Sequence, residues 1–90
     1  MAERVIALLN KRGLHARASA RFVTLAAQQP AIVEVEKDGS KVCGTSIMGL
    51  MMLGAAMGDS ILIRVEGDGA EEALGKLVEL VTSGFGEECG

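Results

Sequence analysis

His15 is the only histidine of the chain, and Arg17 follows it two positions later. A neutral imidazole has a free lone pair, so it can act as a nucleophile toward phosphorus. A nearby arginine can offer a planar fork of N–H donors to phosphate oxygens, a geometry that lysine cannot copy. Taken singly, a histidine at a helix start is more often a cap, and an arginine is more often plain surface. Their coincidence beside Gly13 favours a site for an anionic group.

The surroundings of this pair are positively charged. A stretch without Asp or Glu holds Lys11, Arg12, Arg17 and Arg21. The 90-residue chain nevertheless has a formal net charge of −3. A basic patch on an acidic protein indicates one anionic ligand or one acidic partner surface, although a solvated face remains the plain alternative. Nucleic acid fits poorly, because the chain lacks a basic field and has two phenylalanines as its only aromatic residues.

The composition also argues against a metal, a cofactor and a membrane segment. One histidine and two separated cysteines, Cys43 and Cys89, cannot supply the three or four ligands that zinc requires, and we expect no other cofactor. We expect no disulfide between the two thiols, which fits a reducing compartment. The N-terminal residues begin with charge and contain too short an apolar run for a signal peptide or a membrane span. The sequence therefore predicts a soluble, cytoplasmic protein.

A second group of interest begins at Ser46. This serine precedes a predicted helix, where an N-cap role worth about 1 kcal/mol is enough to explain it. The alternative is regulation by phosphorylation, which adds about −1.5 to −2 charges. The helix that follows is apolar all round. Either some of its methionines, Met48, Met51 and Met52, form an exposed and adaptable docking patch, or all are packed in the core. From the sequence alone, both interpretations stay open.

The hydrophobic pattern predicts the elements that position these residues. They are a central strand over 5–9, a helix over 16–28, a hairpin over 33–42 that turns at Asp38–Gly39, a helix over 47–57, a strand over 61–66, and a last helix from 70 that Asp68 caps and Gly84 closes. This order, βαββαβα, predicts an α+β open-faced β-sandwich, with a four-stranded antiparallel sheet and three helices on one face. Without a repeat or linker, residues 1–90 are expected to form a single domain.

Two segments closely resemble the two signatures of the HPr phosphocarriers. They are Gly13–Ser19, with the sequence GLHARAS, and Gly44–Leu53, with the sequence GTSIMGLMML. The length, the order of elements and the spacing between the motifs also fit, so the resemblance covers essentially the whole chain. The chain departs from the common pattern at Ala18, where most members have proline. This difference suggests the nitrogen-regulatory branch of the family or one of its relatives.

The resemblance implies a phosphocarrier rather than an enzyme. Enzyme I of the phosphoenolpyruvate-dependent phosphotransferase system would phosphorylate His15 at Nδ1, Arg17 would orient the phosphate, and a IIA-type protein would then accept the group. An HPr kinase/phosphorylase would phosphorylate Ser46. The docking face for partners would include Ile47, Met48 and Met51. A carrier that must dissociate from two partners is best served as a monomer.

Two other classes of function compete with the carrier. A regulatory interaction module would dock a target through the methionine patch, under the control of Ser46 phosphorylation and without flux through His15. The presence of His15 argues against this as the only role. A small RNA-binding α+β domain would need aromatic residues on exposed strands and a basic face, and the sequence has neither.

Overall fold

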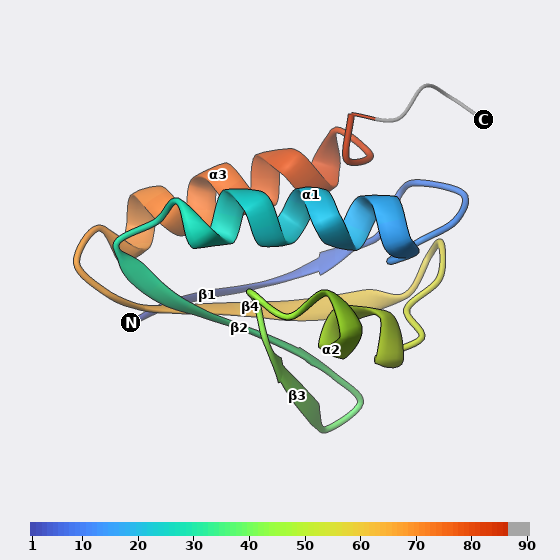
Figure 1. The fold of residues 1–90 in the computed structure, drawn as a ribbon, viewed down its shortest axis with the longest axis horizontal. Coiled ribbons are helices and arrows are strands. Elements are labelled where there is room, and N and C mark those ends of the chain that lie inside the picture. The colour runs from blue at the N-terminus through green and yellow to red at the C-terminus, as the bar shows by residue number, and fades with distance from the viewer. Residues whose placement is uncertain (87–90) are drawn as a thin grey trace.

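The computed structural model describes residues 1–86, which form four strands and three helices in the predicted order. The strands are β1 (Ala2–Ala7), β2 (Ala31–Lys37), β3 (Ser40–Cys43) and β4 (Ser60–Gly67), and the helices are α1 (Ala16–Ala27), α2 (Ile47–Met52) and α3 (Ala70–Thr82). All strand pairs are antiparallel, and the order across the sheet is β1-β4-β2-β3. Figure 1 shows α1 and α3 side by side over the sheet, with α2 beside α1 and β3. The predicted α+β open-faced sandwich is confirmed.

The core lies between one face of the sheet and the helices. Ile61, Ile63 and Val65 alternate along β4 and are all buried, as the predicted period of two requires. Helices α1 and α3 each contribute one buried stripe to the same core, and α2 contributes Leu50. The stripe of α1 contains Ala18, Phe22 and Ala26, and that of α3 contains Leu74, Leu77 and Val81.

The first strand differs from the prediction. It spans Ala2–Ala7 rather than 5–9, and it lies at the edge of the sheet rather than in the centre. Val5 is 65% exposed, because an edge strand with an open outer face buries only alternate residues. The central position belongs to β4, which pairs with both β1 and β2. A short apolar run has the same appearance in an edge strand and a central one, so the sequence could not separate them.

The ends of two helices also differ from the prediction. Helix α2 ends at Met52 and does not reach residue 57, because Gly54 adopts a φ of +64°, outside the helical region. Helix α3 begins after Gly69, which has a φ of +71° and is the N-cap of the helix. No side chain caps this helix start, so the prediction that Asp68 is the cap is wrong. The other end of α3 agrees with the prediction. Gly84 has a φ of +70° and its N–H donates to the carbonyl of Val81 at 3.0 Å.

The β2–β3 hairpin turns at Asp38–Gly39, as predicted. Their φ values of +50° and +83° are both positive, as a type I′ turn requires. Among residues 1–86, no helix is long and apolar enough to cross a membrane.

Candidate functional site

His15 lies directly before α1, where the sequence predicted it. It is the N-cap of this helix, and its Nδ1 atom accepts a hydrogen bond from the backbone N–H of Arg17 at 3.3 Å. The carbonyl of His15 accepts the N–H of Ser19 at 2.9 Å, which begins the helical hydrogen bonding. Because Nδ1 is the acceptor, it carries the ring lone pair, and the proton of the neutral imidazole is on Nε2. The nitrogen with the lone pair is therefore at the positive end of α1.

The loop that carries His15 is packed against the segment between α2 and β4. The N–H of Leu14 donates to the carbonyl of Ala55 at 3.0 Å, and both residues are buried. Gly13 has a φ of +61°, and a Cβ atom on it would lie 2.2 Å from the Ala55 carbonyl oxygen and 2.7 Å from Cα of Ala56. A glycine is needed here, both for the backbone conformation and for the close contact.

Two buried polar side chains lie in the same region, and the sequence analysis gave neither a role. Asn10 Nδ2 donates to the carbonyl of Gly13 at 2.8 Å, and Ser19 Oγ donates to the carbonyl of Leu14 at 3.2 Å. Asn10 is expected in a loop and Ser19 in a helix, but nothing in the sequence shows that both side chains are directed at one backbone segment.

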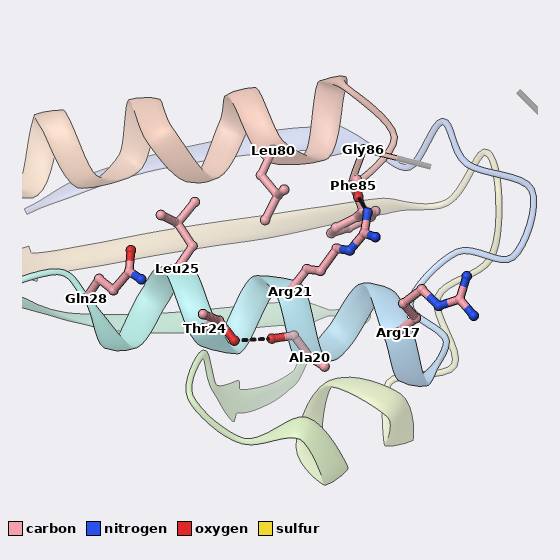
Figure 2. A pocket seen from close by; sticks show the side chains of 9 residues that line it. All are labelled: Arg17, Ala20, Arg21, Thr24, Leu25, Gln28, Leu80, Phe85 and Gly86. Carbon is pink, nitrogen blue, oxygen red and sulfur yellow. Dashed lines mark hydrogen bonds between the residues drawn. The ribbon is translucent and has the colours of Figure 1, made fainter. Parts of the chain in front are cut away.

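The four basic residues do not all face the same way. Lys11, Arg12 and Arg17 are exposed around the loop and the first turn of α1. In Figure 2 the guanidinium of Arg17 extends beyond the N-terminal end of α1, whereas Arg21 turns toward α3 and donates to the carbonyl of Phe85. The positive charge near His15 is thus provided mainly by three of the four predicted residues.

Ser46 is the N-cap of α2. Its Oγ accepts the backbone N–H of Gly49 at 3.0 Å, and its side chain is half-buried. The N-cap interpretation of this serine is therefore confirmed. The short helix that it begins packs against α1 and β3.

The apolar residues of α2 are divided between the core and the surface. Leu50 is fully buried, whereas Ile47, Met48 and Met51 are exposed. The structure thus favours the surface-patch interpretation over complete burial. Met52 is 79% exposed and adds to this apolar surface. We call Ile47, Met48, Met51 and Met52 the α2 patch.

A groove of about 560 Å³ lies between α1 and α3. Its walls include Leu25, Leu80 and Phe85, and Arg17 stands at its edge (Figure 2). This groove could not be predicted from the sequence, because it forms between two helices that are distant in the chain. Its walls are mainly apolar and do not include His15.

A metal centre has no candidate ligands in the described part of the chain. No group of three or more His, Cys, Asp or Glu side chains among residues 1–86 could hold an ion. Cys43 is an exposed free cysteine, and Cys89 lies outside the described residues. The expectation that these two thiols form no disulfide therefore stays a prediction.

Comparison with known proteins assigns the chain to a family. The family model for the phosphorylation site of the HPr component of the phosphotransferase system matches residues 2–83. The chain belongs to the HPr family. As an HPr-type protein it is a phosphocarrier component of the phosphotransferase system and not itself a catalyst. The resemblance to the HPr phosphocarriers is thus confirmed.

Relatives of this HPr-type chain match it over nearly its full length. Phosphocarrier protein HPr of Neisseria meningitidis serogroup A is 46% identical over 87 residues, which cover 97% of this chain and 98% of that protein. Phosphocarrier protein NPr of Shewanella violacea is 35% identical over 85 residues, which cover 94% and 93%. The crystal structure of HPr-C-His from Thermoanaerobacter tengcongensis matches with a TM-score of 0.93 and 48% identity, over 98% of this chain and 99% of that one.

Proposed function

We propose that His15 is the phosphoryl acceptor, which takes the group from phosphorylated enzyme I on Nδ1 and gives it to a IIA-type protein. The observation that carries this proposal is the position of the Nδ1 lone pair at the N-cap of α1, 3.3 Å from the amide nitrogen of Arg17. The first turn of α1 contains no acidic residue, and the amide groups of a helix start favour an anion. The same place thus offers a nucleophile and attracts phosphoryl oxygens.

The proposed transfer exchanges one bond to phosphorus for another. The Nδ1 lone pair attacks phosphorus and forms an N–P bond, while the bond between phosphorus and the donor group of enzyme I breaks and leaves its electron pair on that donor. Nδ1 must first release the Arg17 amide, and their 3.3 Å hydrogen bond is long and therefore weak. The freed amide can then donate to a phosphoryl oxygen. Transfer to the IIA-type protein is the same exchange with the carrier as donor.

Arg17 is proposed to orient the phosphoryl group. Its side chain is exposed in the first turn of α1, and its guanidinium is not held by the α3 contact that holds Arg21. A charge-assisted hydrogen bond to a phosphoryl oxygen contributes roughly 1.5–3 kcal/mol. The planar guanidinium can form two such bonds at once, which would fix the group in one orientation.

The α2 patch is proposed to dock both partners in turn. Its exposed residues Ile47, Met48 and Met51 belong to a helix that packs against α1, the helix that His15 begins. Flexible thioether side chains suit a surface that must fit more than one partner. We infer that phosphorylation of Ser46 by an HPr kinase/phosphorylase would place negative charge at the start of this patch and weaken docking. Brief encounters with two partners fit a monomeric carrier.

A second candidate function is a regulatory module that Ser46 controls, with no flux through His15. The observation that favours it is the continuity between Ser46, the N-cap of α2, and the exposed apolar residues that follow it. The two candidates differ in whether a phosphohistidine forms.

Intact-mass spectrometry separates the two functions. The protein is incubated with enzyme I, phosphoenolpyruvate and Mg²⁺, and half of each sample is then treated with acid. We expect the unsubstituted protein to gain one acid-labile phosphoryl group. The His15→Ala variant should gain none, and its circular dichroism spectrum should match that of the unsubstituted protein. A gain that persists in His15→Ala would place the acceptor elsewhere. No gain, with an enzyme I that phosphorylates another HPr, would favour the regulatory module.

A further inference from the structure

The buried polar side chains of residues 1–86 are those of Asn10, which is 7% exposed, and Ser19, which is 0% exposed. Both donate to carbonyl groups just before His15: Asn10 to Gly13 at 2.8 Å, and Ser19 to Leu14 at 3.2 Å. A buried polar side chain is unfavourable unless it is hydrogen-bonded, and an apolar residue of similar size would avoid this cost. Two such side chains on successive carbonyls suggest a demand on the geometry of this segment.

The contacts hold two consecutive peptide groups. The peptide between Gly13 and Leu14 is held at its carbonyl by Asn10 and at its N–H by the Ala55 carbonyl, 3.0 Å away. Asn10 makes a second hydrogen bond to this segment, because its backbone carbonyl accepts the N–H of Gly13 at 3.2 Å. The next peptide, between Leu14 and His15, is held at its carbonyl by Ser19. The backbone therefore reaches His15 with both preceding peptide planes restrained.

The consequence for His15 is a restricted direction of its side chain. With these planes held, the N–Cα bond of His15 has a fixed direction. The N-cap conformation of His15, with a φ of −76°, then sets the direction of its Cα–Cβ bond and keeps Nδ1 within reach of the Arg17 amide. Asn10 and Ser19 are both too buried to touch a docked partner. Any effect that they have on transfer must therefore act through the placement of the imidazole.

We propose that Asn10 and Ser19 are positioning residues, which together hold the two peptides before His15 so that Nδ1 meets the incoming phosphorus in line. This inference rests on the proposed role of His15 as the acceptor. Reacting groups must be aligned closely, and a displacement of about 1 Å can slow a reaction by as much as about 10²-fold. Loss of one of several restraints should displace Nδ1 by less than that.

The test compares Ser19→Ala and Asn10→Leu with the unsubstituted protein as phosphoryl acceptors from enzyme I. Ser19→Ala removes the hydroxyl, and Asn10→Leu keeps roughly the side-chain volume but removes the Nδ2 donor without adding a charge. We expect kcat to fall roughly tenfold in each, with KM unchanged because the docking surface is intact. The matched control is Ser83→Ala. It removes the hydrogen bond that Ser83 Oγ donates to the Leu80 carbonyl at 2.8 Å, at the end of α3, and it should leave kcat and KM unchanged.

The NMR chemical shift of the Arg17 amide proton is a second readout, which a loss of stability alone would not change. In both variants the Arg17 amide proton should move upfield, because its hydrogen bond to Nδ1 is populated less. Lower melting temperatures with wild-type kcat and an unmoved Arg17 signal would overturn the proposal and leave Asn10 and Ser19 as stabilising residues only. If the unsubstituted protein itself gains no phosphoryl group on His15, the proposed function fails first. Normal acceptance by all proteins defeats only the positioning role.

Discussion

The imidazole of His15 has one observed role and one proposed role, and both need the same nitrogen. As the N-cap of α1, Nδ1 accepts the Arg17 amide, and as the proposed acceptor it must give its lone pair to phosphorus. A side-chain N-cap contributes about 0.5–2 kcal/mol, and this long bond belongs at the low end of that range, so the helix start would lose about 0.5 kcal/mol on phosphorylation. A negative group at a helix N-terminus returns about 0.3–1 kcal/mol, and more when partly buried. The two effects are of similar size, so α1 should stay formed in both states of the carrier.

Arg17→Lys tests the proposed contact between the guanidinium and the phosphoryl group. Lysine keeps the charge but loses the planar pair of donors. Loss of one charge-assisted bond of about 1.5 kcal/mol should slow acceptance from enzyme I by about tenfold, as measured by rapid quench. Arg4→Lys makes the same change on β1 and should have no effect. An Arg17→Lys rate equal to the unsubstituted rate would show that charge alone is sufficient.

The residues of the site differ in how well the sequence predicts them. His15, Arg17 and Ser46 could be selected because each places a chemically active side chain at a predicted helix start, which a pattern can show. Asn10 and Ser19 could not, because their partners are backbone carbonyls and their burial depends on how the loop packs in the folded chain. The residues of the basic patch were predicted correctly. The direction of Arg21 was not, because a contact with Phe85, far away in the chain, turns this side chain toward α3.

At the scale of elements, the loop before α1 depends on the segment after α2. Gly13→Ala would place a Cβ 2.2 Å from the Ala55 carbonyl oxygen, at a φ of +61°. We expect a loss of about 2–5 kcal/mol in the free energy of unfolding, from overpacking and from the left-handed backbone. Urea denaturation measures this loss.

Gly39→Ala is the matched control for the loop. Gly39 also has a positive φ, of +83°, but a Cβ there would meet nothing within 4 Å. This variant should lose only the conformational part, about 1–2 kcal/mol. Equal losses in the two variants would mean that the contact with Ala55 is not a constraint.

The start of α2 gives a second prediction at this scale. In Ser46→Asp the carboxylate is also a good N-cap, so the free energy of unfolding should stay nearly constant. The added charge lies at the proposed docking patch, and it should raise the KM of enzyme I for the carrier by roughly three- to tenfold. Ser40→Asp places the same charge on β3 and should change little. An unchanged KM for Ser46→Asp would leave this serine as a cap alone.

The pattern of the sequence predicted the type and order of every element, but not all their limits. Alternation in β4 and the Asp38–Gly39 turn were sufficient, because both are local signals. The edge position of β1 was missed, because it depends on which strands pair. The early end of α2 was missed because a glycine can also stand inside a helix. The residue type alone does not show that Gly54 adopts a left-handed conformation.

Across the whole molecule, the outer face of the sheet is joined by an ion network. Arg64 of β4 pairs with Glu3 of β1 at 2.9 Å and with Glu34 and Glu36 of β2 at 3.0 and 3.7 Å. Hydrogen bonds to Glu3 and then Glu34 raise the pKa of Arg64 above its usual value. The network therefore spans three strands, and it should weaken with salt because its side chains are only partly buried and dissolved ions reach them.

Lys37 makes stability sensitive to alkaline pH. Its hydrogen bond to Asp38, followed by the charges of Asp38 and Asp59, raises the pKa of its ammonium group above 10.5, against an opposing effect of desolvation. The folded state thus holds this proton more tightly than the unfolded state. The stabilisation is complete below the unfolded pKa and is lost as the pH rises through the folded one.

Lys37→Gln should remove this alkaline loss. Above pH 10.5, the melting temperature of the unsubstituted protein should fall more steeply with pH than that of the variant. Lys76→Gln removes an exposed lysine of α3 and should keep the original slope. Parallel curves for the unsubstituted protein and Lys37→Gln would show that the Asp38 and Asp59 contacts do not persist in solution.

The strand order also has a consequence for biosynthesis. β1 leaves the ribosome well before its only neighbour in the described sheet, β4, which spans Ser60–Gly67. The His15 loop likewise waits for Ala55, whose carbonyl it needs. Such non-local pairing makes folding slower and places it late. A nascent chain whose proposed acceptor, His15, has already emerged therefore still lacks the contacts that hold the His15 loop until the segment around Ala55 has followed.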